Sequence, residues 1–162
     1  MIDRALSKLR GNCQTRRASS IDWPVVARGY ALHLQEENGV DLCEHELAEC
    51  GRYIKALMST PRNAVFILCD GEKRIGQVLC SEVDAELGKR VLLVFGLYIT
   101  PESRGTGVTA LIETCVSEAQ VRGVESCEFC LNPANDTGFY SHIGCKLVGH
   151  LYRLEVNNVH DI

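Results

Sequence analysis

The sequence predicts an α+β fold in which a central mixed, mostly antiparallel sheet is covered by about four helices. Three apolar runs lie between residues 64 and 100, and the Asp70-Gly71 pair that separates the first two is typical of a hairpin turn. The third run leads into a helical segment and then a further strand-like run, which is the order of a crossover connection. A chain of 162 residues supports one sizeable core, so we expect residues 1–162 to form a single domain.

The first half of the chain has the signals of two helices. Apolar residues recur at helical spacing from Asp22, which is expected as an N-cap, to about residue 37. Asp41 and Glu44 have the pattern of a capping box for a second helix. Both helices carry an apolar stripe, so both are expected to pack on the sheet.

The second half adds a third helix over residues 108–122, ended by Gly123, and a short fourth helix between residues 135 and 143. The apolar residues of the third helix fall on one face, which indicates packing against the sheet. Strands are expected at residues 13–18, 64–69, 74–83, 90–100, 126–131, 146–149 and 151–156.

Charge and hydropathy exclude several classes of partner. The net charge of −4 argues against nucleic acid or an anionic membrane as the main partner, because either requires a basic face. No window approaches the ~18 consecutive apolar residues of a membrane span, and the first residues lack the apolar core of a secretory signal. We therefore expect a cytoplasmic protein.

The nine cysteines do not predict a metal site. Cys127 and Cys130 have the spacing of half a zinc site, but the chain offers no second pair of ligands at matching spacing. On a strand, residues three apart also point to opposite faces. We expect no metal, and we interpret most cysteines as small buried side chains in a reducing compartment.

The most informative stretch is residues 91–111, VLLVFGLYITPESRGTGVTAL. An apolar strand breaks at Pro101 and passes through Arg104-Gly105-Thr106-Gly107 into a helix. The first N–H groups of a helix have no partner within it, and the helix dipole is positive at that end. The stretch therefore predicts an anion-binding cradle.

Two segments resemble motifs of a known family. Residues 99–109, ITPESRGTGVT, resemble the acetyl-CoA motif of the GNAT superfamily of N-acetyltransferases, commonly V-x-P-x-x-R-G-x-G-x-G/A. Residues 139–145, FYSHIGC, resemble its second motif, F/L-Y-x-x-x-G-F. The resemblance implies an α/β/α layered GNAT-like fold and an acetyl-CoA-dependent acyltransferase that needs no metal. Thr109 departs from the motif, which usually has Gly or Ala there.

The same resemblance implies which residues hold acetyl-CoA. Backbone groups of Leu97, Tyr98 and Ile99 would pair with the pantetheine, after a bulge at Gly96 that starts a separation from the neighbouring strand. Asn135 lies near the position of a motif asparagine, which is Pro133 here. The expected phosphate cradle is Arg104, Gly105, Thr106, Gly107, Val108 and Thr109.

Transfer of an acetyl group to an amine needs a base and an acid. A lysine-like amine is neutral only about one part in a thousand at pH 7, so a base has to remove its proton. Tyr140 matches the family's general acid toward sulfur, and Glu128 lies where some members place a glutamate base. Other candidates for the base are Glu82, Asp84 and His33.

The acceptor is expected at the first two helices and the last strand pair, by analogy with the family. The first two helices are acidic, which suits a cationic amine, although a solvated helix face explains the same charges. A peptide N-terminus, lysine, a polyamine and an aminoglycoside all stay open as acceptors, and so does a homodimer. Without a Cys-His or Ser-His pair at a motif position, direct attack in a ternary complex is favoured over a covalent acetyl-enzyme. The alternative is a non-catalytic protein of the same fold that binds acyl-CoA or a protein partner. The acidic region consists of His33, Glu36, Glu37, Asp41, Glu44, Glu46 and Glu49.

Overall fold

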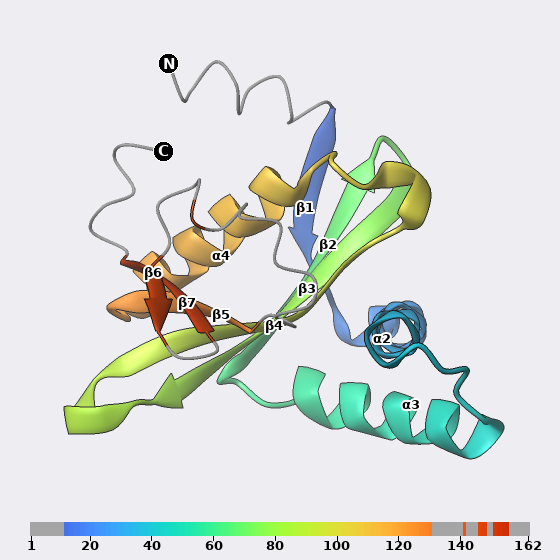
Figure 1. Cartoon of the computed structure of the whole chain (residues 1–162), viewed down its shortest axis with the longest axis horizontal. Helices are drawn as coiled ribbons and strands as arrows, with labels where there is room; N and C mark the ends of the chain where they lie inside the picture. Colours follow the sequence, from blue (N-terminus) through green and yellow to red (C-terminus); the bar gives the residue numbers. More distant parts are fainter. Residues whose placement is uncertain (1–11, 131–140, 142–145, 149–150, 156–162) are drawn as a thin grey trace.

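The computed structural model describes residues 12–130, 141, 146–148 and 151–155. One sheet lies between α4 on one face and α2 with α3 on the other, which confirms the layered α+β fold (Figure 1). The predicted short helix between residues 135 and 143 lies almost wholly outside the described residues. The helices are α2 (Trp23–Asn38), α3 (Glu44–Met58) and α4 (Val108–Arg122), with 3-10 turns η1 (Ser20–Asp22), η2 (Glu86–Gly88) and η3 (Pro101–Ser103).

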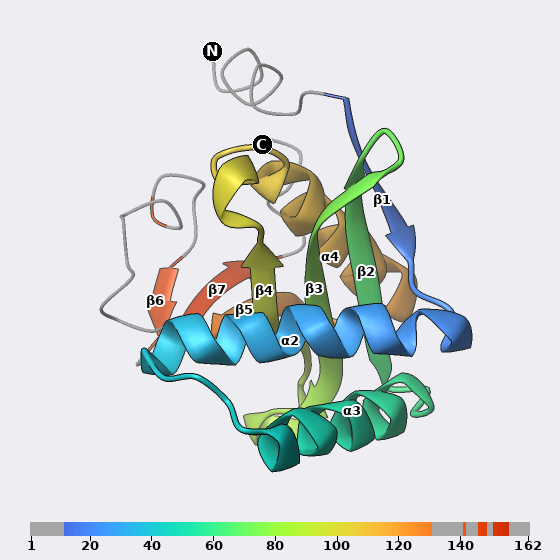
Figure 2. The ribbon, with the colours of Figure 1, turned by 90° about the vertical axis from the view of Figure 1, so that its right-hand side faces the viewer.

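The sheet has seven strands in the order β1-β2-β3-β4-β5-β7-β6. Neighbours pair antiparallel except β4 and β5, which run parallel and are joined by α4 as a crossover. Figure 2 shows α2 crossing one face of the sheet, with α4 on the far face. The strands are β1 (Cys13–Arg17), β2 (Asn63–Asp70), β3 (Lys73–Asp84), β4 (Arg90–Ile99), β5 (Ser126–Cys130), β6 (Lys146–Val148) and β7 (Leu151–Glu155).

Each face of the sheet has its own apolar core. The core under α4 is centred on Leu92, Leu111 and Phe129, all fully buried. The core under α2 and α3 includes Val26 and Ile54, also fully buried. Alternate strand residues thus serve the two cores, which fixes the side of the sheet on which each functional side chain lies. No helix in the described part of the chain has both the length and the apolar character needed to cross a bilayer.

The structure confirms one predicted helix start and corrects the other. Asp22 is the N-cap residue of α2, as predicted, but its carboxylate accepts hydrogen bonds from Ser19 and pairs with Arg16 at 2.7 Å, so it makes no side-chain capping hydrogen bond to α2. The capping box of α3 is Cys43 with Glu46, since the Cys43 N–H donates to the Glu46 carboxylate at 2.7 Å. The helix therefore begins later than the Asp41 pattern predicts.

Candidate active site

The cradle is a turn of free N–H groups at the start of α4. Gly105 and Gly107 both have positive φ, at 82° and 75°, and Gly107 is the N-cap of the helix without a side-chain capping bond. In the described part of the chain, the N–H groups of Gly105, Gly107, Val108 and Thr109 donate to no backbone carbonyl. These donors lie at the positive end of a 15-residue helix, which favours an anion.

The two glycines of the cradle serve different purposes. A Cβ on Gly105 would meet nothing within 4 Å, so this position is open toward a ligand. A Cβ on Gly107 would lie 2.7 Å from Leu68 Cδ2 and 3.2 Å from Cys13 Sγ. Gly107 is therefore required for close packing of α4 on β1 and β2, as well as for its backbone conformation.

Thr109, in the cradle, has a side-chain hydroxyl without a hydrogen-bond partner among the described residues. The residue is buried, with 4% of its surface exposed. An unpaired buried hydroxyl costs about 1–3 kcal/mol, so a ligand that supplies a partner gains that amount. The residue that departs from the motif thus adds a polar group beside the cradle.

Arg104 connects the cradle to α2. Its guanidinium pairs with Glu36, which lies in the last turns of that helix. Both side chains are substantially exposed, so the pair contributes little to stability. Its structural effect is to link the cradle to the helix that lines the neighbouring cavity.

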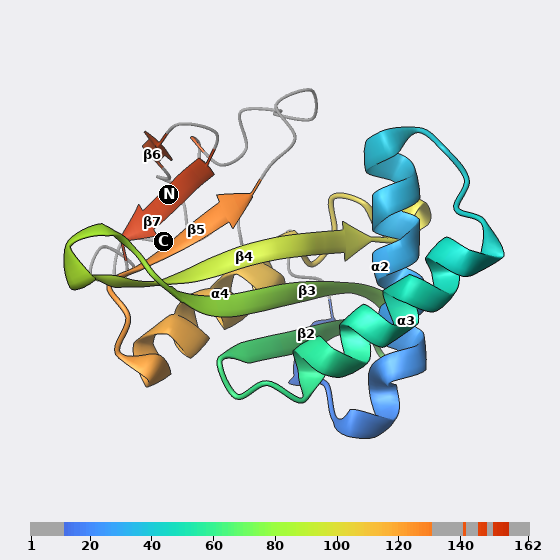
Figure 3. The same cartoon turned by 90° about the horizontal axis from the view of Figure 1, so that it is seen from below.

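The central strand β4 has a bulge and then an open edge. Gly96 has φ of 61°, and the pairing with β3 shifts register there, which confirms the predicted bulge. Parallel pairing with β5 ends at Val94 and Phe129, although β4 continues to Ile99. Figure 3 shows the two strands diverging toward their C-terminal ends.

The backbone groups along this edge alternate between two directions. The N–H of Thr100 donates to Ile75 of β3 at 2.8 Å. By alternation, Tyr98 also turns its backbone toward β3, whereas Leu97 and Ile99 turn theirs toward the open edge. Of the three residues expected to pair with a ligand, two therefore present backbone groups that no other described strand pairs.

A cavity of about 350 Å³ lies where β4 and β5 separate beneath α2. Burial lowers the pKa of His33, while the charges of Glu37 and Glu36 oppose that shift. His33 Nε2 lies 3.4 Å from Glu37 Oε2, so the two side chains form a pair at the cavity wall. Burial, followed by the nearby Tyr53, raises the pKa of Tyr30 to about 12, so this phenol stays protonated. The cavity is lined by Tyr30, His33, Leu34, Glu37, Asn38, Phe95, Gly96 and Cys130.

Glu128 lies on the same face of the sheet as this cavity. It is buried, with 7% of its surface exposed, and it pairs in register with Leu93 of β4. Cys130, two residues further along β5, lines the cavity. Partial desolvation, together with the charges of Glu128 and Glu37, raises the pKa of the Cys130 thiol. This thiol is therefore a poor nucleophile at neutral pH.

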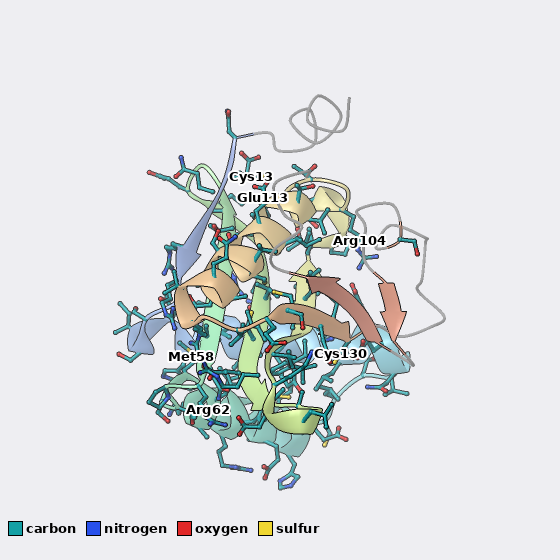
Figure 4. The ribbon with its side chains drawn as sticks, turned by 90° about the vertical axis from the view of Figure 1, so that its left-hand side faces the viewer. Cys13, Met58, Arg62, Arg104, Glu113 and Cys130 are labelled. Atoms are coloured by element: carbon teal, nitrogen blue, oxygen red, sulfur yellow. The ribbon has the colours of Figure 1, made fainter. Side chains whose placement is uncertain are left out.

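Two other candidates for the base are held in ion pairs away from the cavity. Glu82 pairs with Arg90 at 2.7 Å and with Arg122 at 3.3 Å. Asp84 pairs with Arg62 at 2.8 Å, and Arg62 lies at the opposite end of the molecule from Arg104 (Figure 4). The structure thus leaves Glu128 and His33 as the described candidates.

Tyr140 and Asn135 lie outside the described residues, so both assignments stay predictions. Cys127 is buried under α4 whereas Cys130 lines the cavity on the other face, as expected for residues three apart on a strand. Among the described residues, no group of three or more His, Cys, Asp or Glu side chains could hold a metal ion.

Sequence reasoning did not find the cavity walls formed by Tyr30 and Phe95. Both fit an apolar core pattern, and only the bulge at Gly96 gave a signal that this part of β4 opens. Of the acidic region, His33 and Glu37 reach the cavity. Glu36 pairs with Arg104, and the others whose contacts are described cap α3 or form surface pairs.

Comparisons with known proteins identify the family of the chain. The sequence matches the Acetyltransferase (GNAT) family over residues 30–144. A search of curated proteins gave no match.

Three solved structures illustrate the likeness of fold. A predicted acetyltransferase with acetyl-CoA from Clostridium acetobutylicum has a TM-score of 0.71 and 19% identity, covering 85% of this chain and 92% of that one. A GCN5-related N-acetyltransferase from Ralstonia eutropha JMP134 has a TM-score of 0.68 and 14% identity, covering 85% and 94%. An aminoglycoside acetyltransferase from an uncultured soil metagenomic sample has a TM-score of 0.65 and 16% identity, covering 84% and 93%. The family match spans well over half of the chain, and the chain belongs to the GNAT acetyltransferase family.

Proposed function

We propose that the protein transfers an acetyl group from acetyl-CoA to a primary amine that is cationic in solution. The observation that carries this proposal is the continuity of three features along β4: an acidic cavity at the bulge, an open backbone edge, and the cradle at the start of α4. A ligand with an anionic end, an amide-bearing chain and a reactive end matches that order. The likeness to a solved acetyltransferase with acetyl-CoA supports the same ligand.

The residues present fit coenzyme A. The free N–H groups of Gly105, Gly107, Val108 and Thr109 suit its pyrophosphate, and the Thr109 hydroxyl lies beside them without a partner among the described residues. Leu97 and Ile99 offer backbone groups to the amide-bearing chain. Acetyl-CoA supplies the acetyl thioester.

The acidic cavity suits the acceptor. Glu37 places a carboxylate at the cavity wall, and a negative charge there attracts an ammonium group. The ammonium gives up a proton to Glu128, and the neutral amine forms a bond to the thioester carbon. The carbon–sulfur bond then breaks, and Tyr140 gives a proton to the departing thiolate. The second proton of the attacking nitrogen returns to the tyrosinate, so the products are the amide and the CoA thiol. His33 is the alternative acceptor of the first proton, since burial keeps its imidazole neutral near pH 7.

Direct attack is supported by the state of Cys130. Its raised pKa disfavours a covalent acetyl-cysteine at the cavity. We therefore expect a ternary complex, with intersecting lines in initial-rate plots. Parallel lines, or an acetylated Cys130 trapped in the absence of amine, would contradict this mechanism.

The decisive experiment is an amine panel with acetyl-CoA. Release of free CoA thiol that depends on a polyamine, an aminoglycoside, a lysine peptide or a peptide N-terminus supports the proposal. Coenzyme A binding without turnover over the whole panel supports the non-catalytic alternative. With an accepted amine, kcat/KM should rise with pH, and Glu128→Gln and His33→Asn identify the base by which of them flattens that rise.

A cradle variant tests the binding site itself. Thr106 is half-buried in the cradle turn, and its φ is not positive, so Thr106→Glu adds a negative charge without backbone strain. We expect it to weaken coenzyme A binding at least about tenfold, whereas Thr106→Gln, of the same size, keeps most of the affinity. Equal affinities by calorimetry would remove the cradle from the binding site.

A further inference from the structure

A second and larger hollow lies on the other side of α2. It has a volume of about 700 Å³ and is formed between α2 and α3, which lie side by side on one face of the sheet (Figures 2 and 3). It shares no lining residue with the acidic cavity. The hollow, called here the α2–α3 groove, is therefore separate from the proposed active site.

The walls of the α2–α3 groove are apolar, with small side chains at its centre. Ala27 and Ala31 of α2 face Gly51 of α3, and a Cβ on Gly51 would meet only Trp23, at 3.4 Å. Leu47 lines the rim and is 44% exposed. The volume of the groove falls within the range of about 300–1,000 Å³ that is typical of sites for small apolar ligands.

The charged residues of the groove are all cations. Arg28, Arg52 and Lys55 line it, and no carboxylate does. In the described part of the chain Arg28 has no ion pair, and Lys55 places its Nζ 3.8 Å from the ring centroid of Trp23. Only Arg52 is paired, with the exposed Glu49.

This local charge is opposite to the charge of the whole chain, which is −4. A groove with apolar walls and three cations attracts a molecule that has an apolar chain and an anionic end. An amine would find no counter-ion among the lining residues. A partner helix would need a larger apolar surface than a groove of this size provides.

We propose that the α2–α3 groove binds an amphipathic carboxylate, namely a medium-chain fatty acid. The chain lies against Trp23 and the two alanines, and the carboxylate accepts hydrogen bonds from Arg28 and Lys55. This site is distinct from the proposed acetyl-transfer site, because no residue lines both the groove and the acidic cavity.

The test uses the fluorescence of Trp23, which is the only tryptophan of the chain and lines the groove. Decanoate, titrated below its micellar concentration, should give a saturable change in Trp23 emission and a matching heat by calorimetry. Decylamine has the same chain with the opposite charge, and butyrate has the charge without the chain. Neither decylamine nor butyrate should show saturable binding.

Three variants assign the binding to the groove. Arg28→Gln should weaken decanoate binding about tenfold, since it removes a charge-assisted hydrogen bond but leaves Trp23 in place. Leu47→Asp should abolish binding, because it adds an anion to an exposed position on the rim. The control Arg62→Gln removes an exposed arginine that is paired with Asp84 far from the groove, and it should bind normally.

Several results would overturn the proposal. These are no saturable binding of decanoate, equal binding of decylamine, or undiminished binding by Arg28→Gln. Binding of an acidic amphipathic peptide in place of decanoate would assign the groove to a protein partner and would equally contradict the proposal. Circular dichroism on each variant confirms that the fold is intact.

Discussion

Gly107→Ala should destabilise the protein considerably more than Gly105→Ala, although the two glycines lie two residues apart in one turn. Both have positive φ, so alanine costs about 1–2 kcal/mol at either position. At Gly107 the new Cβ also lies 2.7 Å from Cδ2 of Leu68, so this fully buried side chain has to shift. Such overpacking adds about 1–3 kcal/mol.

The difference between the two variants is the quantity to measure. The unfolded chain loses the same freedom in both, so that contribution cancels. A difference of about 1–3 kcal/mol corresponds to about 2–12 °C in Tm for a chain of this size. Urea unfolding followed by tryptophan fluorescence gives the free energies of unfolding, and calorimetry gives Tm.

Equal losses in the two variants would refute the assignment of Gly107 to packing. The result also decides how the cradle should be tested. Gly107→Glu would disturb the contact with Leu68 and Cys13, so lost coenzyme A binding in that variant could arise from misfolding. Thr106→Glu avoids this contact and reports on binding alone.

Four further variants test the acid, an ion-pair network and a pH-dependent contact. Tyr140→Phe should lower kcat by ~10²–10⁴ with little change in coenzyme A affinity, and activity within about threefold of wild type would show that the tyrosine is not the acid. Arg122→Met should cost about 3 kcal/mol in urea unfolding, because Arg122 is 12% exposed and pairs with two carboxylates that are also largely buried. Arg62→Met, which breaks an exposed pair, should cost less than about 1 kcal/mol, and similar losses in the two would contradict this interpretation. Hydrogen bonds and charge from Arg16 hold the pKa of Asp22 well below its usual range, so this carboxylate stabilises the fold above about pH 4, and the contribution is lost as the pH falls through the folded pKa. Asp22→Asn should therefore be less stable than wild type at pH 7, and the gap should close in acid; a gap independent of pH would exclude the ion pair as its cause.

Local patterns predicted the strands and the bulge well. The strands expected at residues 64–69 and 74–83 form β2 and β3, because the turn at Asp70-Gly71 and the apolar alternation both act over neighbouring residues. Gly96 was expected to start the separation of β4, and it adopts the positive φ of a bulge. A single glycine in an apolar strand is a strong local signal.

Capping was predicted less well, because several residues compete for each helix end. Asp22 has the right type and place for an N-cap, but Arg16 of β1 and Ser19 take its carboxylate. Cys43 is a weak capping residue by type, yet Glu46 reaches back to its N–H. Which partner wins depends on where β1 and the loop before α3 lie, and local sequence does not contain that information.

The sequence by itself determined the fold class, the glycine turn before α4 and the family, since these depend on hydrophobic period, turn residues and a short motif of contiguous residues. Only the tertiary structure decided what lies next to the cradle. In the folded chain His33 and Glu37 line a cavity beside Cys130, and Glu36 pairs with Arg104. Glu82 and Asp84 form ion pairs elsewhere. The tertiary structure also opened a cationic groove on the other side of α2. These juxtapositions join residues far apart in the chain, and their geometry is set by how the helices pack on the two faces of the sheet, which is a property of the whole molecule.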